Sequence, residues 1–177
     1  MRIKSVSIAI LTFLFTFCTS PKIDYQKINQ FLANKEYQQA IRQIDGYREF
    51  MLTPQDQKKL NQLYISADKG LLFDNLENII STGDSIKLKA ELASIKQQIQ
   101  SRDSLTQRWY FFDYYLAQSH LHRILNDSLN QLNYLLMAVE YPVRDVQKKI
   151  NAFLDLAFYY GKTGQFEKAR EWLDKAF

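Results

Sequence analysis

Cysteine, proline, glycine and histidine are all scarce in this chain of 177 residues. It contains one cysteine, two histidines, three prolines and five glycines. A single cysteine excludes a disulfide within the chain. So few glycines and prolines leave little of the turn chemistry that a many-stranded protein needs at each hairpin. The scarcity of these residues therefore favours helices before any periodicity is considered.

A strong excess of one charge is missing as well. The formal net charge is +4, and Arg2 and Lys4 at the N-terminus contribute two of these positive charges. Elsewhere the basic residues alternate with acidic ones, as in Lys87, Lys89 and Glu91. Nothing in this pattern forms a basic stripe that could follow a phosphate backbone, so we expect no nucleic-acid partner.

Motifs that would indicate catalysis are also missing. The only histidines, His120 and His122, diverge by about 200° on a helix and cannot readily share one metal ion. The sequence has no glycine-rich phosphate loop, serine elbow or paired-cysteine motif. We therefore expect no catalytic residue, no metal and no cofactor. A hydrolase built on carboxylates such as Asp113, Asp127 and Asp155 is the least favoured function.

The composition that remains is that of a folded protein with an export segment. Hydrophobic residues make up 46% of the chain and charged residues 24%, which is too apolar for a disordered protein. Residues 1–17 combine a positive start with an apolar run that is too short to span a bilayer. They predict a signal peptide, followed by a short tether at residues 18–22.

The lone cysteine, Cys18, lies where the apolar run ends. The segment Leu14-Phe15-Thr16-Phe17-Cys18 resembles the lipobox of bacterial lipoproteins, although such boxes usually have a small residue where Phe17 stands. The resemblance implies lipid attachment at Cys18 and a membrane-anchored protein of the periplasm or outer membrane. The alternative is that Cys18 merely lies in a leader that is cleaved nearby or left uncleaved.

Residues 23–177 are expected to form one helical repeat domain, because apolar residues recur at spacings of three and four along them. The pattern predicts an all-α fold of about eight helices that stack as antiparallel helical hairpins. Pro54 is expected to begin a third helix that reaches about residue 80. Ser104 and Gln107 are expected to form a capping box that begins the fifth helix.

The last hairpin carries the clearest internal pattern. Phe153, Leu156, Ala157 and Tyr160 fall at the spacing of the first helix of a tetratricopeptide repeat, and the matches continue into the second helix. These further matches are Ala169, Leu173 and Ala176. The chain thus resembles the tetratricopeptide family, which implies a right-handed superhelix of helical hairpins. The first hairpin carries a weaker copy, with Phe31 at the tyrosine position followed by Tyr37, Ala40 and Ile44. A generic helical solenoid or bundle is the alternative.

The resemblance implies a protein that holds another protein or peptide rather than an enzyme. Tyr110 and Tyr114 are candidates to line the binding groove, because they point away from Trp109 and Phe112 on their helix. The alternative is that both tyrosines pack against neighbouring hairpins.

Apolar residues continue to the end of the sequence, where Trp172 and Phe177 are further candidates for partner binding. They predict self-association or docking of another chain that continues the stack, and they also fit a chain that is the leading part of something longer. The alternative function is an extracytoplasmic ligand-sensing segment of a larger regulatory system. The sequence names no partner.

Overall fold

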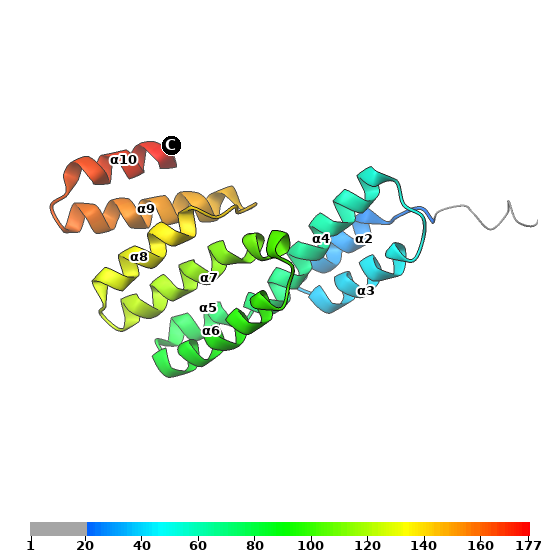
Figure 1. Cartoon of the computed structure of the whole chain (residues 1–177), viewed down its shortest axis with the longest axis horizontal. Helices are drawn as coiled ribbons and strands as arrows, with labels where there is room; N and C mark the ends of the chain where they lie inside the picture. The colour runs from blue at the N-terminus through cyan, green and yellow to red at the C-terminus, as the bar shows by residue number, and fades with distance from the viewer. Residues whose placement is uncertain (1–20) are drawn as a thin grey trace, which may run out of the picture. The chain divides into compact units, whose positions relative to one another are not determined.

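The computed structural model describes residues 21–177, and within that range every regular element is a helix. This confirms the expected all-α fold (Figure 1). The signal peptide predicted at residues 1–17 and Cys18 lie outside the described range. The described residues divide into two compact units, residues 21–70 and residues 71–177, and each unit is described by itself.

The first unit contains α2 (Tyr25–Ala33), α3 (Tyr37–Arg48) and most of α4 (Pro54–Phe73). Its core is formed by Ile28, Ile44 and Leu60, one residue from each helix, and all three are fully buried. Polar contacts fix the start of α4, because the hydroxyl of Thr53 accepts a hydrogen bond from the backbone N–H of Asp56 at 3.1 Å. Such a cap satisfies a donor that the first turn of a helix leaves without a partner.

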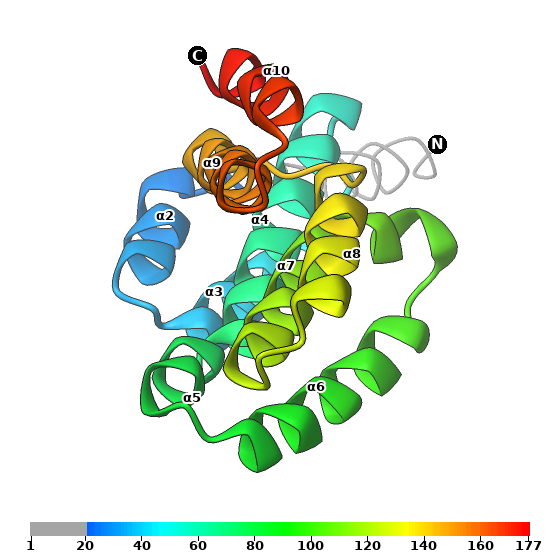
Figure 2. The ribbon, with the colours of Figure 1, turned by 90° about the vertical axis from the view of Figure 1, so that its left-hand side faces the viewer.

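The second unit is a series of antiparallel hairpins in which neighbours along the chain pack side by side, as Figure 1 shows. Its helices are α5 (Leu76–Thr82), α6 (Ser85–Gln100), α7 (Ser104–Ile124), α8 (Ser128–Val139), α9 (Val146–Lys162) and α10 (Phe166–Ala176). Gly83, Asn126 and Gly164 adopt positive φ in the turns between paired helices, which glycine and asparagine tolerate best. In Figures 1 and 2, α9 lies between α8 and α10.

Two details of the expected helices differ from the structure. The long third helix is broken near residues 74 and 75 into α4 and α5. The fifth helix is capped by Asp103, whose carboxylate accepts hydrogen bonds from the backbone N–H groups of Leu105 and Thr106. Ser104 is therefore the first helical residue and forms no capping box with Gln107. A carboxylate is a strong N-cap acceptor, and Asp103 takes that position.

A shared set of side chains forms the main core of the second unit. These residues come from four helices and include Phe112 of α7, Leu135 of α8, Leu156 of α9 and Ala169 of α10. Their burial stabilises the stack by roughly 1.5–3 kcal/mol for each large side chain. Helices α7 to α10 therefore share one hydrophobic core.

The two helical glycines of the first unit provide a matched test of its packing. A Cβ on Gly70 in α4 would overlap the ring of Tyr37, whereas a Cβ on Gly46 in α3 would meet nothing within 4 Å. We expect Gly46→Ala to raise the free energy of unfolding by about 0.5–1 kcal/mol, because alanine favours a helix. Gly70→Ala should lower it by about 1–3 kcal/mol through overpacking. Urea denaturation checks both, and an equal gain from the two variants would contradict the close packing of Tyr37 on α4.

Candidate functional site: an exposed apolar face on the last hairpin

The aromatic run of α7 does not line an exposed groove. Tyr110 is fully buried and Tyr114 is 6% exposed, which corrects the expectation that these tyrosines face a partner. They form one buried stripe with Ala117 and Leu121, at the helical spacing of i, i+4, i+7 and i+11. Because α7 packs against both α6 and α8, it is buried on more than one side. The alternative that both tyrosines pack within the stack is the one that fits.

The aromatic residues that do reach the surface of the α7/α8 hairpin are only partly exposed. Tyr115 lies at their centre, with ring centroids 5.6 Å from Phe111, 6.1 Å from Tyr134 and 5.5 Å from Tyr141. Burial, followed by the neighbouring Tyr141 hydroxyl, raises the pKa of Tyr115. These rings fill the space between one another, so the cluster ties α7 to α8 and leaves no aromatic cage open for a ligand.

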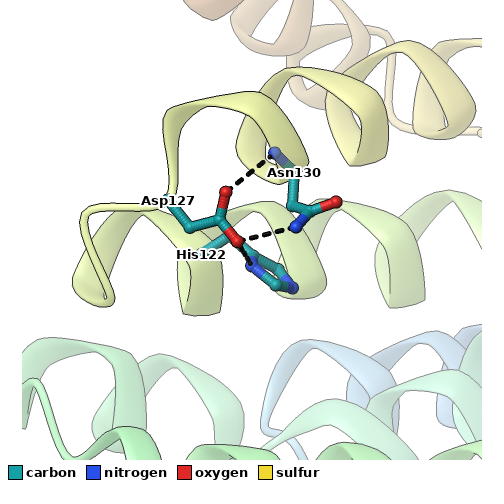
Figure 3. Close-up of polar contacts among 3 residues, drawn as sticks. All are labelled: His122, Asp127 and Asn130. Carbon is teal, nitrogen blue, oxygen red and sulfur yellow. Dashed lines mark hydrogen bonds and ion pairs between the residues drawn. The ribbon is translucent and has the colours of Figure 1, made fainter.

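Figure 3 shows how polar contacts close the same hairpin. The ring nitrogen Nδ1 of His122 lies 3.0 Å from Oδ2 of Asp127, and Asn130 donates its side-chain N–H to the same oxygen at 2.7 Å. Asp127 is the N-cap of α8, where hydrogen bonds from Asn130 and then from His122 lower its pKa. His122 also stacks on Tyr134 at 5.1 Å. This histidine therefore orders the turn between α7 and α8.

One ion pair also connects two helices of the stack. Nζ of Lys148 in α9 lies 2.9 Å from Oδ1 of Asp113, a carboxylate of α7 that is 8% exposed. Burial lowers the pKa of Lys148, but the charge and hydrogen bond of Asp113, together with the charges of Asp145 and Glu77, raise it, and the net shift is upward. Among residues 21–177 no group of three potential ligand side chains could hold a metal ion.

The exposed phenylalanines of the second unit lie on the last hairpin, together with an exposed leucine. Phe158 of α9 is 74% exposed, and Phe166 and Leu173 of α10 are 73% and 41% exposed. Phe177, which follows α10, is 97% exposed. Phe166, Leu173 and Phe177 are spaced by seven and four residues, so they form one stripe along α10. On α9, Leu154 precedes Phe158 by one turn and is half-buried.

Contacts between α9 and α10 show on which side of the hairpin these stripes lie. Trp172 packs on Phe153 at 5.7 Å, and Nζ of Lys168 lies 5.3 Å from the ring centroid of Tyr160. Phe153 and Tyr160 lie toward the edge of α9 that packs into the shared core with α8. By helical geometry, Leu154 and Phe158 lie on the side of α9 away from this core, whereas Phe166, Leu173 and Phe177 lie beside the packed face of α10.

We call this surface the end face. It consists of Leu154, Phe158, Phe166, Leu173 and Phe177. Its apolar side chains come from two helices that pack against each other. Exposed apolar surface of this kind is characteristic of interaction sites.

Most residues of the repeat pattern in the last hairpin are buried, but not all of them. Leu156, Ala157, Tyr160, Ala169 and Ala176 are buried, as the repeat pattern requires. Phe153 is half-buried.

Two of the assignments change places. Trp172, expected to face a partner, is partly covered by Phe153, whereas Leu173, expected to pack inward, is exposed on the end face. Phe177 stays on the exposed surface.

Phe158 and Phe166 were missed by the sequence analysis. The signal for Phe158 is a second apolar stripe of α9, in which Val146, Ile150, Leu154 and Phe158 recur every four residues. This stripe lies beside the repeat signature rather than on it, so an amphipathic helix with a single apolar face does not account for it.

Comparison with known proteins found no matching family model, no similar curated protein and no similar solved structure. None of the helices in the described part of the chain is both long enough and apolar enough to cross a membrane.

The half-buried His120 of α7 makes stability depend on pH. Burial, and then the charge of Arg123, lower the pKa of His120 from 6.5 to about 4. The unfolded chain therefore takes up a proton between pH 6.5 and 4 that the folded chain does not, so stability falls as the pH falls through this window. From pH 7 to 5 the loss should be about 1–2 kcal/mol.

Urea denaturation of the wild type and of His120→Gln at both pH values measures this contribution. The variant cannot take up the proton, so its stability should change less between pH 7 and 5. Equal losses in the two proteins would show that His120 does not contribute to the acid sensitivity.

Proposed function

We propose that this protein is an exported, lipid-anchored module of tetratricopeptide type that holds another protein through its end face. The supporting observation is the exposure of Phe158, Phe166 and Leu173 on neighbouring helices of one hairpin. The buried Ala157 and Ala169 support the likeness to a repeat, since small residues at the contact let the two helices approach closely.

The end face suits a helix better than an extended peptide. Its residues come from α9 and α10, two helices that pack against each other. An amphipathic helix laid along this surface would bury its own apolar stripe against both, in the way that consecutive helices of the stack already bury theirs. Binding of this kind depends on shape and apolar contact, so the proposal includes no catalytic step.

The export part of the proposal depends on Cys18 and the apolar run before it. A lipid on Cys18 would fix the module at a membrane, with the tether and the helical units on the far side of the export machinery. An interaction module held in this way would bring its partner to the cell envelope.

The end face is tested by paired substitutions. Phe158→Glu with Phe166→Glu should weaken self-association and partner binding by at least tenfold, because two charges replace the apolar contact while both side chains are already solvent-exposed. Ile86→Glu with Leu105→Glu is the matched control, since Ile86 and Leu105 are 83% and 75% exposed on other helices. Analytical ultracentrifugation gives the association state, and pull-down of the full chain from its native membrane gives the partners.

Circular dichroism verifies that both pairs keep their helical content. A wild-type protein that is monomeric at high concentration, and whose co-purifying partners are the same in both pairs of variants, would overturn the proposed role of the end face.

The lipid anchor is tested by metabolic labelling of cells with a clickable fatty acid. We expect the wild-type chain to take up the label and Cys18→Ser to take up none, because the thiol is the attachment point in proteins with a lipobox. Label that is equal in the two proteins would refute anchoring through Cys18 and favour simple secretion or an uncleaved leader.

A further inference from the structure

A small cavity in the first unit lies where the C-terminal end of α3 meets the beginning of α4. Its volume is about 240 Å³. This is somewhat below the range of about 300–1,000 Å³ that is usual for drug-sized ligands, so it fits a group of about one amino-acid residue. The residues that line it are Arg48, Phe50, Leu52, Gln57, Leu60 and Asn61.

The guanidinium of Arg48 is held in place at this cavity by contacts on several sides. One terminal nitrogen donates to Oδ1 of Asn61 at 2.8 Å, and the other donates to Oδ1 of Asp45 at 3.1 Å. The guanidinium carbon lies 4.3 Å from the ring centroid of Tyr64, in the geometry of a cation–π contact. These two hydrogen bonds use two of the five N–H groups of arginine. A fixed planar donor group is the arrangement that recognises a carboxylate.

Besides Arg48 the lining is mixed, with polar Gln57 and Asn61 on the exposed side and three apolar residues, Phe50, Leu52 and Leu60. Leu60 is fully buried and belongs to the core of the unit, Leu52 is half-buried, and Phe50 is 48% exposed. An apolar group that enters beside Arg48 would thus meet hydrocarbon on one side and a positive charge on the other. Transfer of that group from water would contribute to affinity in proportion to the area buried.

We propose that this cavity binds a carboxylate that carries a compact apolar group, such as the C-terminal residue of a peptide ending in leucine. The carboxylate accepts hydrogen bonds from Arg48, and the apolar group packs on Phe50, Leu52 and Leu60. Asp45 repels the incoming negative charge and so keeps the affinity moderate. This site lies in residues 48–61 and does not depend on the end face.

The experiment titrates the full chain with N-acetylleucine, N-acetylleucinamide and N-acetylglycine, using calorimetry or the chemical shifts of backbone amides. N-acetylleucine should bind about tenfold more tightly than the amide, which lacks the charge, and more tightly than N-acetylglycine, which lacks the apolar group. Equal binding of the acid and its amide, or no binding at millimolar concentration, would overturn the proposal.

Substitutions distinguish a ligand-binding Arg48 from one that only stabilises the fold. Arg48→Gln should weaken binding of N-acetylleucine by about tenfold or more. Asp45→Asn should strengthen it, because it removes the repelling charge and keeps a hydrogen-bond acceptor. Arg42→Gln, an exposed residue of α3 that does not line the cavity, is the matched control and should leave binding unchanged.

Phe50→Ala provides a second variant if Arg48→Gln unfolds, since Phe50 is half-exposed and should affect only the apolar part of the affinity. The site would be contradicted if Asp45→Asn weakened the binding of N-acetylleucine. It would also be contradicted if Arg42→Gln weakened binding as much as Arg48→Gln. A peptide with a free C-terminal leucine that binds at least as tightly as N-acetylleucine would identify a chain end as the ligand. Weaker binding of the peptide would identify a small free acid.

Discussion

The packing of α7 between α6 and α8 determines where the aromatic side chains of the second unit lie. Phe112 enters the core that α7 shares with α8, α9 and α10, while Tyr110 and Tyr114 are buried on another side of the same helix. Asp113 lies between these directions and pairs with Lys148 of α9. Removing one partner of such an ion pair would leave a charge buried without compensation, which is strongly destabilising. Helix α7 is therefore held by packing on α6 and α8 and by an ion pair to α9.

The last hairpin also packs into the shared core, but some of its apolar side chains remain exposed. Ala157 and Ala169 are small enough to let α9 and α10 approach closely, and larger residues such as Leu156 connect α9 to the shared core. The apolar residues on the remaining side, above all Phe158 and Phe166, have no comparable cover. These exposed phenylalanines of one hairpin are the physical basis for placing an interaction surface there.

Polar contacts connect the helices of the first unit. The hydroxyl of Tyr25 on α2 donates to Asp56 on α4 at 2.6 Å, and burial together with this carboxylate raises the pKa of Tyr25 to about 12. Arg48 at the end of α3 is joined to Asn61 on α4. A cavity beside such a side chain is already organised for a ligand, so binding costs little additional ordering.

The sequence by itself determined that the described chain is helical and where most helices begin, because apolar spacing, N-capping aspartates and turn residues such as Gly83 and Gly164 act locally. It also placed Ala157 and Tyr160 in a buried pattern. It could not decide which apolar stripe of a helix is covered when there are two, because that depends on which neighbours pack on it. Tertiary packing therefore decided that Tyr110 and Tyr114 are buried and that Phe158 is exposed. It also decided the position of Arg48, whose partner Asn61 is thirteen residues away and comes from another helix.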